Sequence, residues 1–394
     1  MALYYKKGLI LNILFIQNSF PKHNTGGAAA SCRDLILYLN RRGHNINVLT
    51  AESNGIVGAD NIYNQLKALP KANRSSEYET FINKAKWLLY SRYNYFRTRY
   101  LIKKTKADVI YLHNLELTTP SPLLAAVDSG KQVVLHARNL HYADLWKYAT
   151  GEKKRSVYKY LFKLDVSFDG VRIITVSHFV KQQFIVNGYP ENLITTVYNG
   201  IVIDNIPQVN LQTQRKRKAI FIGDISPHKG CRIAIEALGI LKQEGIEIPI
   251  DIYGHIGNPD YYEQCLSLVK HYHLADLVYF CGDQTKNKIY DALSTSEYFL
   301  FPSLWEEPFG RVAVEAMACG CIVIGSKRGG IPEVVDDCGL IVEPTPALFA
   351  EAIKQCMTWT PKKRQETAEA AWERASKLFR IENTVAAVEK TLSQ

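Results

Sequence analysis

Two glutamates flank the start of a predicted helix in the stretch PSLWEEPFGRVAVEAMACGCIVIGSKRGGIPEVV, residues 302–335. Gly310 permits a tight entry into a helix beginning near Arg311, so the backbone N–H groups of residues 309–312 should point outward at the positive end of the helix dipole. Such an array suits a diphosphate. Because Glu307 precedes the helix and Glu315 lies about one turn inside it, one carboxylate can reach a sugar and the other a ribose.

Each glutamate also has a plainer interpretation, which the sequence leaves open. Glu315 stands between Val314 and Ala316, where a charge is unfavourable to bury unless it is hydrogen-bonded. Two vicinal hydroxyl groups would satisfy it, but so would an ion pair with a lysine. Glu307 equally suits the positive end of a helix without any ligand.

Two glycine-containing turns carry a second and a third phosphate signal. In FIGDISPHKG a strand ends at Gly223, and the turn after it delivers Lys229 to the start of a helix. A cation there is unfavourable without a nearby anion, so Lys229 is predicted to meet a phosphate and not merely solvent. Gly26 and Gly27 follow the first strand and open the first helix, which permits a ligand to approach the backbone.

Strand-like and amphipathic helical runs alternate along the whole chain, and they do so twice. This pattern predicts two doubly wound α/β domains: 1–198, a linker at 199–217, and 218–375, with a C-terminal helix at 376–394 returning to the first domain. The carboxyl ends of both sheets are then expected to line a central cleft. The predicted strands are 11–17, 45–50, 109–112, 132–135, 172–176, 219–222, 250–253, 278–281, 298–301, 322–324 and 340–342.

The amino-acid composition is that of an ordinary globular protein, and it gives little information about which molecules the protein binds. The 394 residues are 47% hydrophobic and 22% charged, with a formal charge of +10, which favours an anionic partner. The apolar runs are strand-length, below the ~20 residues of a membrane span, and the N-terminus resembles a first strand more than a signal peptide. Eight cysteines without a CxxC pair predict reduced structural thiols in the cytoplasm.

Residues 86–106, KWLLYSRYNYFRTRYLIKKTK, mix aromatic and basic side chains at near-helical spacing. Such a face can rest on anionic lipid. The plainer interpretation, and the favoured one, is a long helix whose aromatic side chains pack on the sheet while its basic side is solvated.

These strings together resemble the retaining glycosyltransferases of family 4, over nearly the whole chain. In that family Glu-x7-Glu, preceded by Pro-Ser and followed by Ala-Met-Ala-x-Gly, belongs to the donor site, and here it is Glu307 and Glu315. The resemblance implies the GT-B fold. It also implies that Glu315 binds ribose hydroxyls, that Glu307 contacts the donor sugar near its anomeric carbon, and that the Phe309 and Gly310 backbone contacts the phosphates.

The chain departs from the family pattern at two positions. Where the family commonly has Gly-Arg-Leu, this sequence has Gly223-Asp224-Ile225, so that a phosphate-binding arginine is missing and Lys229 or Arg311 would carry more of its role. Where a strand often ends in His-Asp or Arg-Asp, the sequence reads VVLHARN, which makes Arg138, or nearby His136, the candidate. His113 ranks below them because a lone histidine at a strand end is more often structural. Ser177 and Asn199, in the family's serine-led helix and hinge, are expected to be mainly structural.

The resemblance therefore predicts a retaining transfer from a nucleotide diphosphate sugar, with UDP as the default, to a glycan or lipid-linked acceptor. No Asp-x-Asp pair occurs in the sequence, so no metal is expected. A nucleotide-sugar epimerase of the same fold, and a basic lipid- or nucleic-acid-binding protein with a decayed sugar site, are the rival hypotheses. The predicted catalytic residues are Glu307, Lys229 and Arg138, and the predicted donor-binding residues are Gly26, Gly27, Gly223, Lys229, Glu307, Phe309, Gly310, Arg311, Val312 and Glu315, with His113, His136 and Asn199 ranked lower.

Overall fold

The computed structural model describes residues 9–20, 27–68, 77–115, 118–140, 170–207 and 216–393. The chain divides into two compact units. The first unit comprises Met1–Val197 and Thr384–Gln394, and the second unit comprises Tyr198–Asn383. Of the predicted linker, residues 208–215 lie outside the described part.

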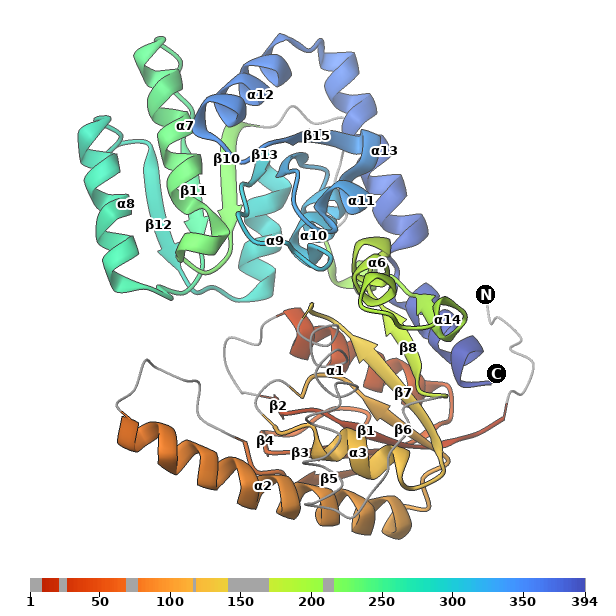
Figure 1. Cartoon of the computed structure of the whole chain (residues 1–394). Coiled ribbons are helices and arrows are strands. Elements are labelled where there is room, and N and C mark those ends of the chain that lie inside the picture. The colour runs from red at the N-terminus through yellow and green to blue at the C-terminus, as the bar shows by residue number, and fades with distance from the viewer. Residues whose placement is uncertain are drawn as a thin grey trace. The chain divides into compact units, whose positions relative to one another are not determined.

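The first unit is built on a seven-stranded parallel sheet with the order β5-β3-β1-β6-β7-β8-β9 (Figure 1). Every residue of β6 is buried, and so are the last four of β1, because helices cover both faces of such a sheet. The strands are β1 (Asn12–Ile16), β3 (Asn45–Thr50), β5 (Asn61–Asn64), β6 (Val109–Leu112), β7 (Gln132–Ala137), β8 (Arg172–Thr175) and β9 (Ile194–Thr196), and β2 (Ser19–Phe20) pairs separately with β4 (Glu52–Ser53).

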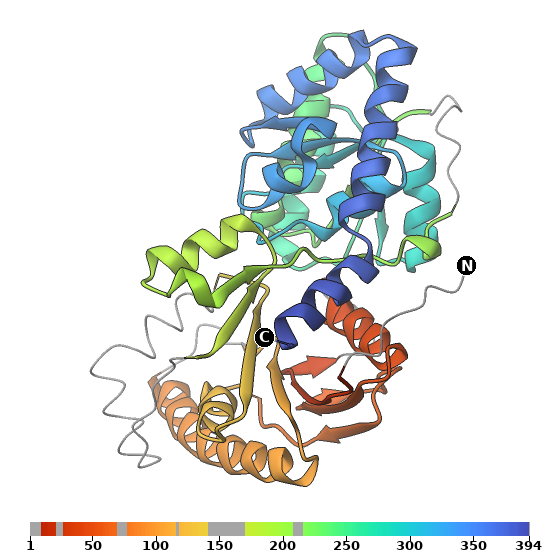
Figure 2. The same cartoon turned by 90° about the vertical axis from the view of Figure 1, so that its right-hand side faces the viewer.

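The described helices of the first unit are α1 (Gly27–Arg41), α2 (Glu77–Lys104), α3 (Ser121–Val127) and α6 (His178–Val186), with the end of α14 (Ile381–Leu392). Ser177 caps α6, since its hydroxyl accepts a hydrogen bond from the Val180 amide at 3.2 Å, in keeping with the structural role predicted for it. Glu389 of α14 pairs with Arg42, just after α1, at 2.9 Å. Figure 2 shows α14 beside α1 at this point.

Helix α2 buries the face opposite to the one that the favoured interpretation required. Leu89, Tyr93, Phe96 and Tyr100, which follow one another at steps of four, three and four residues, are 67%, 43%, 57% and 50% exposed. The buried face carries Tyr95, Leu101 and Ile102 together with Asn94. Asn94 exchanges two hydrogen bonds with the Lys67 backbone, and the Tyr95 hydroxyl donates to Asp128 at 2.7 Å. The prediction that the aromatic residues pack on the sheet is therefore wrong for this stripe.

The second unit contains a six-stranded parallel sheet with the order β12-β11-β10-β13-β14-β15. Its strands are β10 (Lys216–Ile222), β11 (Ile250–Tyr253), β12 (Val278–Gly282), β13 (Ser296–Phe301), β14 (Ile322–Ser326) and β15 (Gly339–Val342). The chain runs outward in one direction from β10 and then crosses over to β13. The point between β10 and β13 is thus the switch point at which open α/β sheets bind ligands.

Helices α7 (Cys231–Gln243), α8 (Pro259–His271), α9 (Lys286–Thr295), α10 (Arg311–Ala318), α11 (Ile331–Val335), α12 (Pro346–Thr358) and α13 (Pro361–Leu378) complete the second unit. Its hydrophobic core is one continuous cluster, which includes Leu238 of α7, Leu300 of β13 and Phe349 of α12. The eight cysteines are free thiols. Among the described residues, no helix is both long enough and apolar enough to cross a membrane.

Candidate functional site

Lys229 and Glu307 meet at the switch point of the second unit. Lys229 follows β10 and Glu307 follows β13, and the lysine Nζ lies 2.5 Å from Oε1 of the glutamate. The Ser303 hydroxyl donates to the same oxygen at 3.0 Å. Glu307 is only 8% exposed, so its charge is compensated by one cation and one hydroxyl group and not by bulk water.

Gly230 makes this approach of two strand ends possible. It adopts a left-handed conformation with φ of 72° between the 3₁₀ turn Pro227–Lys229 and helix α7. A Cβ at this position would overlap the carbonyl oxygen of Pro302, the first residue after β13. The glycine thus serves both the backbone conformation and the close packing that brings Lys229 to Glu307.

Helix α10 begins at Arg311 after Gly310, which has a φ of 93°, as the sequence predicts. The Ala313 amide donates to the Gly310 carbonyl at 2.9 Å, so the amides before it stand at the open end of the helix. Phe309 is buried, with its ring centroid 5.5 Å from that of Phe379. The helix start is therefore anchored through a core side chain, and its first two residues, Arg311 and Val312, are half-buried.

Glu315 is 8% exposed and lies among basic and phenolic groups. Its Oε1 is 3.3 Å from Nε of Arg311, 3.6 Å from Nζ of Lys286 and 3.5 Å from the Tyr290 hydroxyl. The ion pair considered as the plainer interpretation is thus present, with an arginine as well as a lysine. All three contacts use the same oxygen, which is compatible with a ligand at the other.

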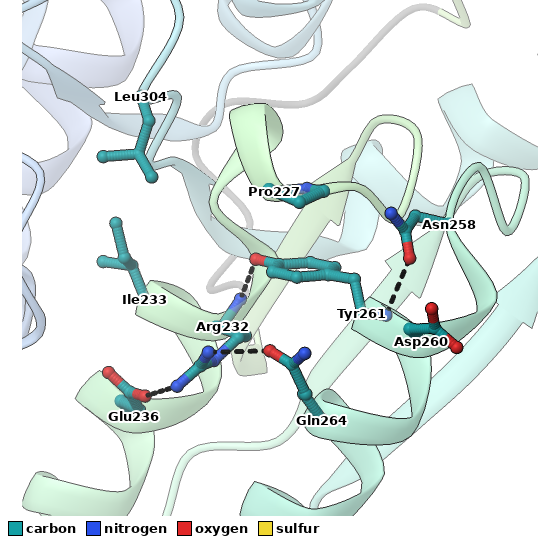
Figure 3. A pocket seen from close by; sticks show the side chains of 9 residues that line it. All are labelled: Pro227, Arg232, Ile233, Glu236, Asn258, Asp260, Tyr261, Gln264 and Leu304. Atoms are coloured by element: carbon teal, nitrogen blue, oxygen red, sulfur yellow. Dashed lines mark hydrogen bonds and ion pairs between the residues drawn. The ribbon is translucent and has the colours of Figure 1, made fainter. Parts of the chain in front are cut away.

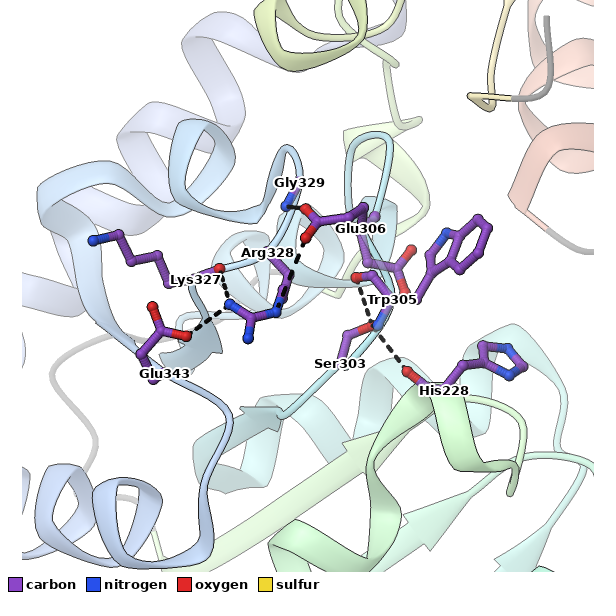
Figure 4. A network of polar contacts seen from close by, with 9 residues as sticks. His228, Ser303, Trp305, Glu306, Lys327, Arg328, Gly329 and Glu343 are labelled. Carbon is purple, nitrogen blue, oxygen red and sulfur yellow. Dashed lines mark hydrogen bonds and ion pairs between the residues drawn. The ribbon is translucent and has the colours of Figure 1, made fainter. Parts of the chain in front are cut away.

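The loop that carries Glu307 is tied down on both sides (Figure 4). On one side, the amides of Leu304 and Trp305 donate to the His228 carbonyl at 2.9 and 3.2 Å. On the other, the Gly329 amide donates to the Glu306 carboxylate at 2.5 Å, and the Gly330 amide donates to the Glu307 carbonyl at 2.6 Å.

This anchoring depends on small residues at the turn after β14. A Cβ at Gly329 would overlap the Glu307 backbone, and one at Gly330 would come within 2.7 Å of the Pro308 carbonyl oxygen. Arg328, which pairs with Glu343 at 2.7 Å, fixes the same turn (Figure 4). The backbone of Glu307 is consequently held in place by the fold itself, and its carboxylate is held by Lys229 and Ser303.

Gly223 and Asp224 occupy the turn after β10. The Gly223 amide donates to the Tyr253 carbonyl at 2.9 Å, and Gly254 packs closely on the Gly223 backbone. Asp224, at the position of the missing arginine, is exposed to solvent. Within the described turn and the 3₁₀ segment after it, Lys229 is therefore the basic side chain that contacts Glu307.

The first unit gathers a second polar cluster at the carboxyl ends of β6 and β7. His113 and His136 are fully buried with ring centroids 5.4 Å apart, and Arg138 is 8% exposed. Burial, and after it the Arg138 charge, hold the pKa of both imidazoles well below the usual range. Both rings are therefore neutral at physiological pH.

Two neighbours of this cluster are not in the set predicted from sequence. The Tyr111 hydroxyl lies 2.6 Å from Nδ1 of His136, and burial raises the pKa of the Cys32 thiol to about 12. In the second unit, Ser303, Lys286 and Tyr290 also contact site residues without having been predicted from the sequence. Ser303 was within reach of sequence reasoning, four residues before Glu307, whereas Lys286 and Tyr290 come from α9 and are brought in by packing.

The remaining predicted residues fall outside these two groups. Gly26 lies outside the described residues, and Gly27 is the exposed first residue of α1. Asn199 is buried in the second unit, next to Tyr198, whose pKa is raised to about 12 by burial and by a hydrogen bond with Glu333. None of the predicted site residues lines the pocket of about 380 Å³ between α7 and α8. Its polar side chains largely bond to one another, as Arg232 does to Gln264 and Glu236 (Figure 3).

Comparison with known proteins identifies the family of this chain, several of its relatives and solved structures with a similar fold. Residues 202–374 match the family model Glycosyl transferases group 1, and residues 25–205 match Glycosyltransferase Family 4. Spore coat protein SA of Bacillus subtilis is 26% identical over 323 residues, which are 73% of this chain and 80% of that protein. The capsular polysaccharide biosynthesis glycosyltransferase CapH of Staphylococcus aureus is 27% identical over 66% of this chain and 71% of that protein.

Among solved structures, the Anabaena protein Alr3699/HepE in complex with UDP and glucose superposes with a TM-score of 0.68 at 21% identity, covering 98% of this chain and 100% of that one. WaaG, a glycosyltransferase involved in lipopolysaccharide biosynthesis, gives 0.66 at 17% identity over 97% and 100%. These likenesses show the GT-B fold. Since the two family models match adjoining parts of the sequence, from residue 25 to residue 374, the chain belongs to the family 4 glycosyltransferases.

Proposed function

We propose that this glycosyltransferase moves a sugar, with retention of configuration and without a metal ion, from a nucleotide diphosphate sugar to a glycan or lipid-linked acceptor in the synthesis of a cell-surface polysaccharide or glycolipid. The observation that carries the proposal is the arrangement of Lys229, Glu307 and the start of α10 at the switch point of the second unit. The cation and the helix start there suit the diphosphate of such a donor, and the carboxylate suits its sugar.

The start of α10 and Lys229 are suited to the diphosphate, because amides at a helix start and an ammonium group both stabilise developing negative charge on a leaving group. Glu307 is suited to the sugar next to its anomeric carbon, where positive charge develops. Glu315, one oxygen of which is held by Arg311 and Lys286, is suited to the ribose hydroxyls. Arg138 of the first unit is the third proposed catalytic residue.

UDP is the proposed nucleotide, supported by the UDP complex of the HepE neighbour. In the retaining step, the bond from the anomeric carbon to the phosphate oxygen breaks with its electron pair, and the acceptor oxygen bonds on the same face. The acceptor proton passes to the departing diphosphate. Metal independence is supported by a sequence without an Asp-x-Asp pair, because the positive charges of Lys229 and α10 can take the role that a metal ion has elsewhere.

Release of nucleoside diphosphate from UDP-, GDP- and ADP-sugars tests this proposal. Glu307→Ala and Glu315→Ala should each lower release from the preferred donor by about a hundredfold, the effect of removing one electrostatic group from a site of this kind. The matched control is Glu373→Ala, an exposed helical glutamate that forms an ion pair with Lys377 one turn away. Conversion of the sugar nucleotide without release of diphosphate would instead support the epimerase.

We also propose that the solvent face of α2, at residues 86–106, contacts an anionic membrane surface. Its centre is the exposed stripe Leu89, Tyr93, Phe96 and Tyr100. Exposed basic residues flank the stripe, namely Lys86, Arg92, Lys103 and Lys104. Apolar side chains that insert between cations that meet phosphate are the arrangement of interfacial helices.

A cation-lined cavity adjoins this face and supports the same partner. It has a volume of about 590 Å³ and is lined by Arg99, Lys103, Lys106 and Lys131, with Asp108 as its acid. A phosphate headgroup would fit its charge. The enzyme would then act at the cytoplasmic, inner face of the membrane, where a lipid-linked acceptor is within reach.

Flotation with vesicles measures this contact independently of activity. The protein should float with phosphatidylglycerol vesicles at low salt, less so at high salt, and remain at the bottom with phosphatidylcholine alone. Phe96→Ser combined with Tyr100→Ser should weaken flotation, whereas Trp372→Ser, which removes an exposed aromatic residue of the second unit, should not. Failure of the wild type to float would remove the proposal.

A further inference from the structure

A pocket of about 380 Å³ opens in the second unit between helices α7 and α8. Its lining comes from three places: the turn before α7 and α7 itself, the start of α8, and Leu304 in the loop after β13 (Figure 3). Pockets that hold small molecules have volumes of about 300–1,000 Å³, so this one is large enough for a ligand. None of the described residues that line it belongs to the proposed donor site.

Arg232 orders the polar side of this pocket. Its guanidinium donates to Oε1 of Gln264 at 2.9 Å and to Oε1 of Glu236 at 3.2 Å. Its backbone amide donates to the Tyr261 hydroxyl at 3.0 Å. These bonds join α7 to α8 and hold the polar side chains of both helices in place (Figure 3).

The same side chains keep hydrogen-bonding groups that the described residues do not use. Gln264 is bonded through its amide oxygen, which leaves its NH₂ group as a donor, and Glu236 is bonded through one carboxylate oxygen, which leaves the other as an acceptor. The exposed carboxylate of Asp260 adds two further acceptor oxygens. Nε of Arg232 is buried and has no hydrogen-bonding partner within the described part of the chain. The pocket therefore presents both donors and acceptors.

This combination selects a ligand whose own groups both donate and accept. A phosphate group offers mainly acceptors, and the carboxylates of Glu236 and Asp260 would repel it. An ammonium group offers only donors, and the Arg232 guanidinium would repel it. A hydroxyl group donates one hydrogen bond and accepts two, so vicinal hydroxyl groups of a sugar can meet a carboxylate and an amide at the same time.

The other side of the pocket is apolar and is formed by Pro227, Ile233 and Leu304. Leu304 is 49% exposed, and Trp305 next to it is 46% exposed. Large apolar side chains that are exposed together mark binding surfaces, whereas scattered single ones do not. A pyranose ring carries an apolar C–H face as well as hydroxyl groups, so it matches both sides of the pocket.

We propose that this pocket binds one neutral sugar unit of a glycan. Asp260, Glu236 and Gln264 would bond to its hydroxyl groups, and the apolar side would pack on its C–H face. That the glycan is the acceptor of the transfer rests on the proposed function.

The position of the pocket connects it with the transfer reaction. Leu304 precedes Glu307 by three residues, and Pro227 precedes Lys229 by two. Three residues of chain span at most about 11 Å, so the pocket lies close to the proposed donor site. A glycan held there by one sugar unit would stay near the reacting sugar between successive transfers.

Saturation-transfer NMR on the full chain without donor measures sugar binding directly. The probes are the methyl glycosides of glucose, galactose, mannose and N-acetylglucosamine. At least one of them should bind, with a Kd of about 1 mM because an open site for one small ligand binds weakly. Excess inorganic phosphate should not displace it. Lack of binding by all four glycosides, or displacement by phosphate, would overturn the proposal.

Variants locate the bound sugar. Asp260→Ala combined with Gln264→Ala removes two exposed side chains of the pocket and should weaken binding about tenfold or more, through lost hydrogen bonds. Asp276→Ala combined with Gln355→Ala removes the same chemical groups at exposed positions outside the pocket and is the control. Glu307→Ala, in the proposed donor site, should bind the sugar as the wild type does. Binding that survives the pocket variant, or that is lost in Glu307→Ala, would overturn the proposal.

Kinetics test the link to the acceptor. A tetrasaccharide of the sugar that binds best serves as the acceptor probe, and release of nucleoside diphosphate is followed. The pocket variant should raise the KM for the tetrasaccharide about tenfold without changing the KM for the donor. A tetrasaccharide that does not speed release, or an unchanged KM for it in the variant, would overturn the acceptor role. If the wild type released no nucleoside diphosphate from any donor, the proposed function would fail, while sugar binding measured without donor would still decide the pocket.

Discussion

The ammonium group of Lys229 lies 2.5 Å from the Glu307 carboxylate, although 78 residues separate the two in sequence. The pair joins the ends of the two strands at the switch point of the second sheet. In the proposed reaction, Lys229 faces two anions, Glu307 and the donor diphosphate. It can hold the carboxylate ready while the site is empty and neutralise the phosphates when they arrive.

Replacing Lys229 by glutamine is therefore expected to impair the reaction twice. The diphosphate loses a counter-charge and Glu307 is left buried without its cation, so kcat/KM for nucleoside diphosphate release should fall by about a hundredfold or more. Lys362→Gln, at an 85% exposed side chain of α13, is the control. A Lys229→Gln enzyme with wild-type kinetics would contradict the assignment of Lys229 to the phosphates.

Gly230→Ala should lower both stability and activity. A left-handed alanine destabilises by about 1–2 kcal/mol, and here the added Cβ also overlaps the Pro302 carbonyl, which would push the Glu307 loop away. Gly245→Ala isolates the first effect, since Gly245 has a φ of 80° and open space around its Cβ. Urea unfolding should show the larger loss for Gly230→Ala, and equal losses would mean that the close packing at Pro302 has no energetic role.

Acidification should destabilise the first unit. The pKa values of His113 and His136 are lowered in the folded state, so below about pH 6.5 the unfolded chain binds more protons than the folded chain. The free energy of unfolding therefore decreases as the pH decreases below that value. Each imidazole can contribute up to about 1.4 kcal/mol per pH unit. Denaturant unfolding at pH 7.5 and pH 5.5 should show this slope, and His113→Leu should flatten it; an unchanged slope in that variant would refute the assignment.

Chelation is expected to leave the reaction unaffected. If Lys229 and the start of α10 neutralise the leaving diphosphate, nucleoside diphosphate release should be the same in excess EDTA as without it. Magnesium added afterwards should not raise the rate. Activity that disappears with EDTA and returns with magnesium would show that a metal ion is required, and the sequence argument from the lack of an Asp-x-Asp pair would then be wrong.

The sequence by itself determined the two doubly wound sheets and the start of the helix at Arg311. Alternation of buried strands and helical runs is a local property, and a glycine before a small-residue helix signals its own backbone conformation. The predicted strand Val109–Leu112 matches β6 residue for residue, for this reason. Short, half-exposed strands such as β5 were missed because they carry little apolar pattern.

Only the tertiary structure decided which charges meet and which faces are hidden. The ion pair of Lys229 with Glu307, the contacts of Lys286 and Tyr290 with Glu315, and the bond of Tyr111 to His136 all join segments distant in sequence. The exposed stripe of α2 was likewise misjudged, because the opposite face, which includes Tyr95, Leu101 and Ile102, is the one that is buried. The local pattern of residue types determines the hydrophobic period of each helix or strand and the residues at its ends. Which side chains contact one another depends on the tertiary packing of segments that are distant in sequence.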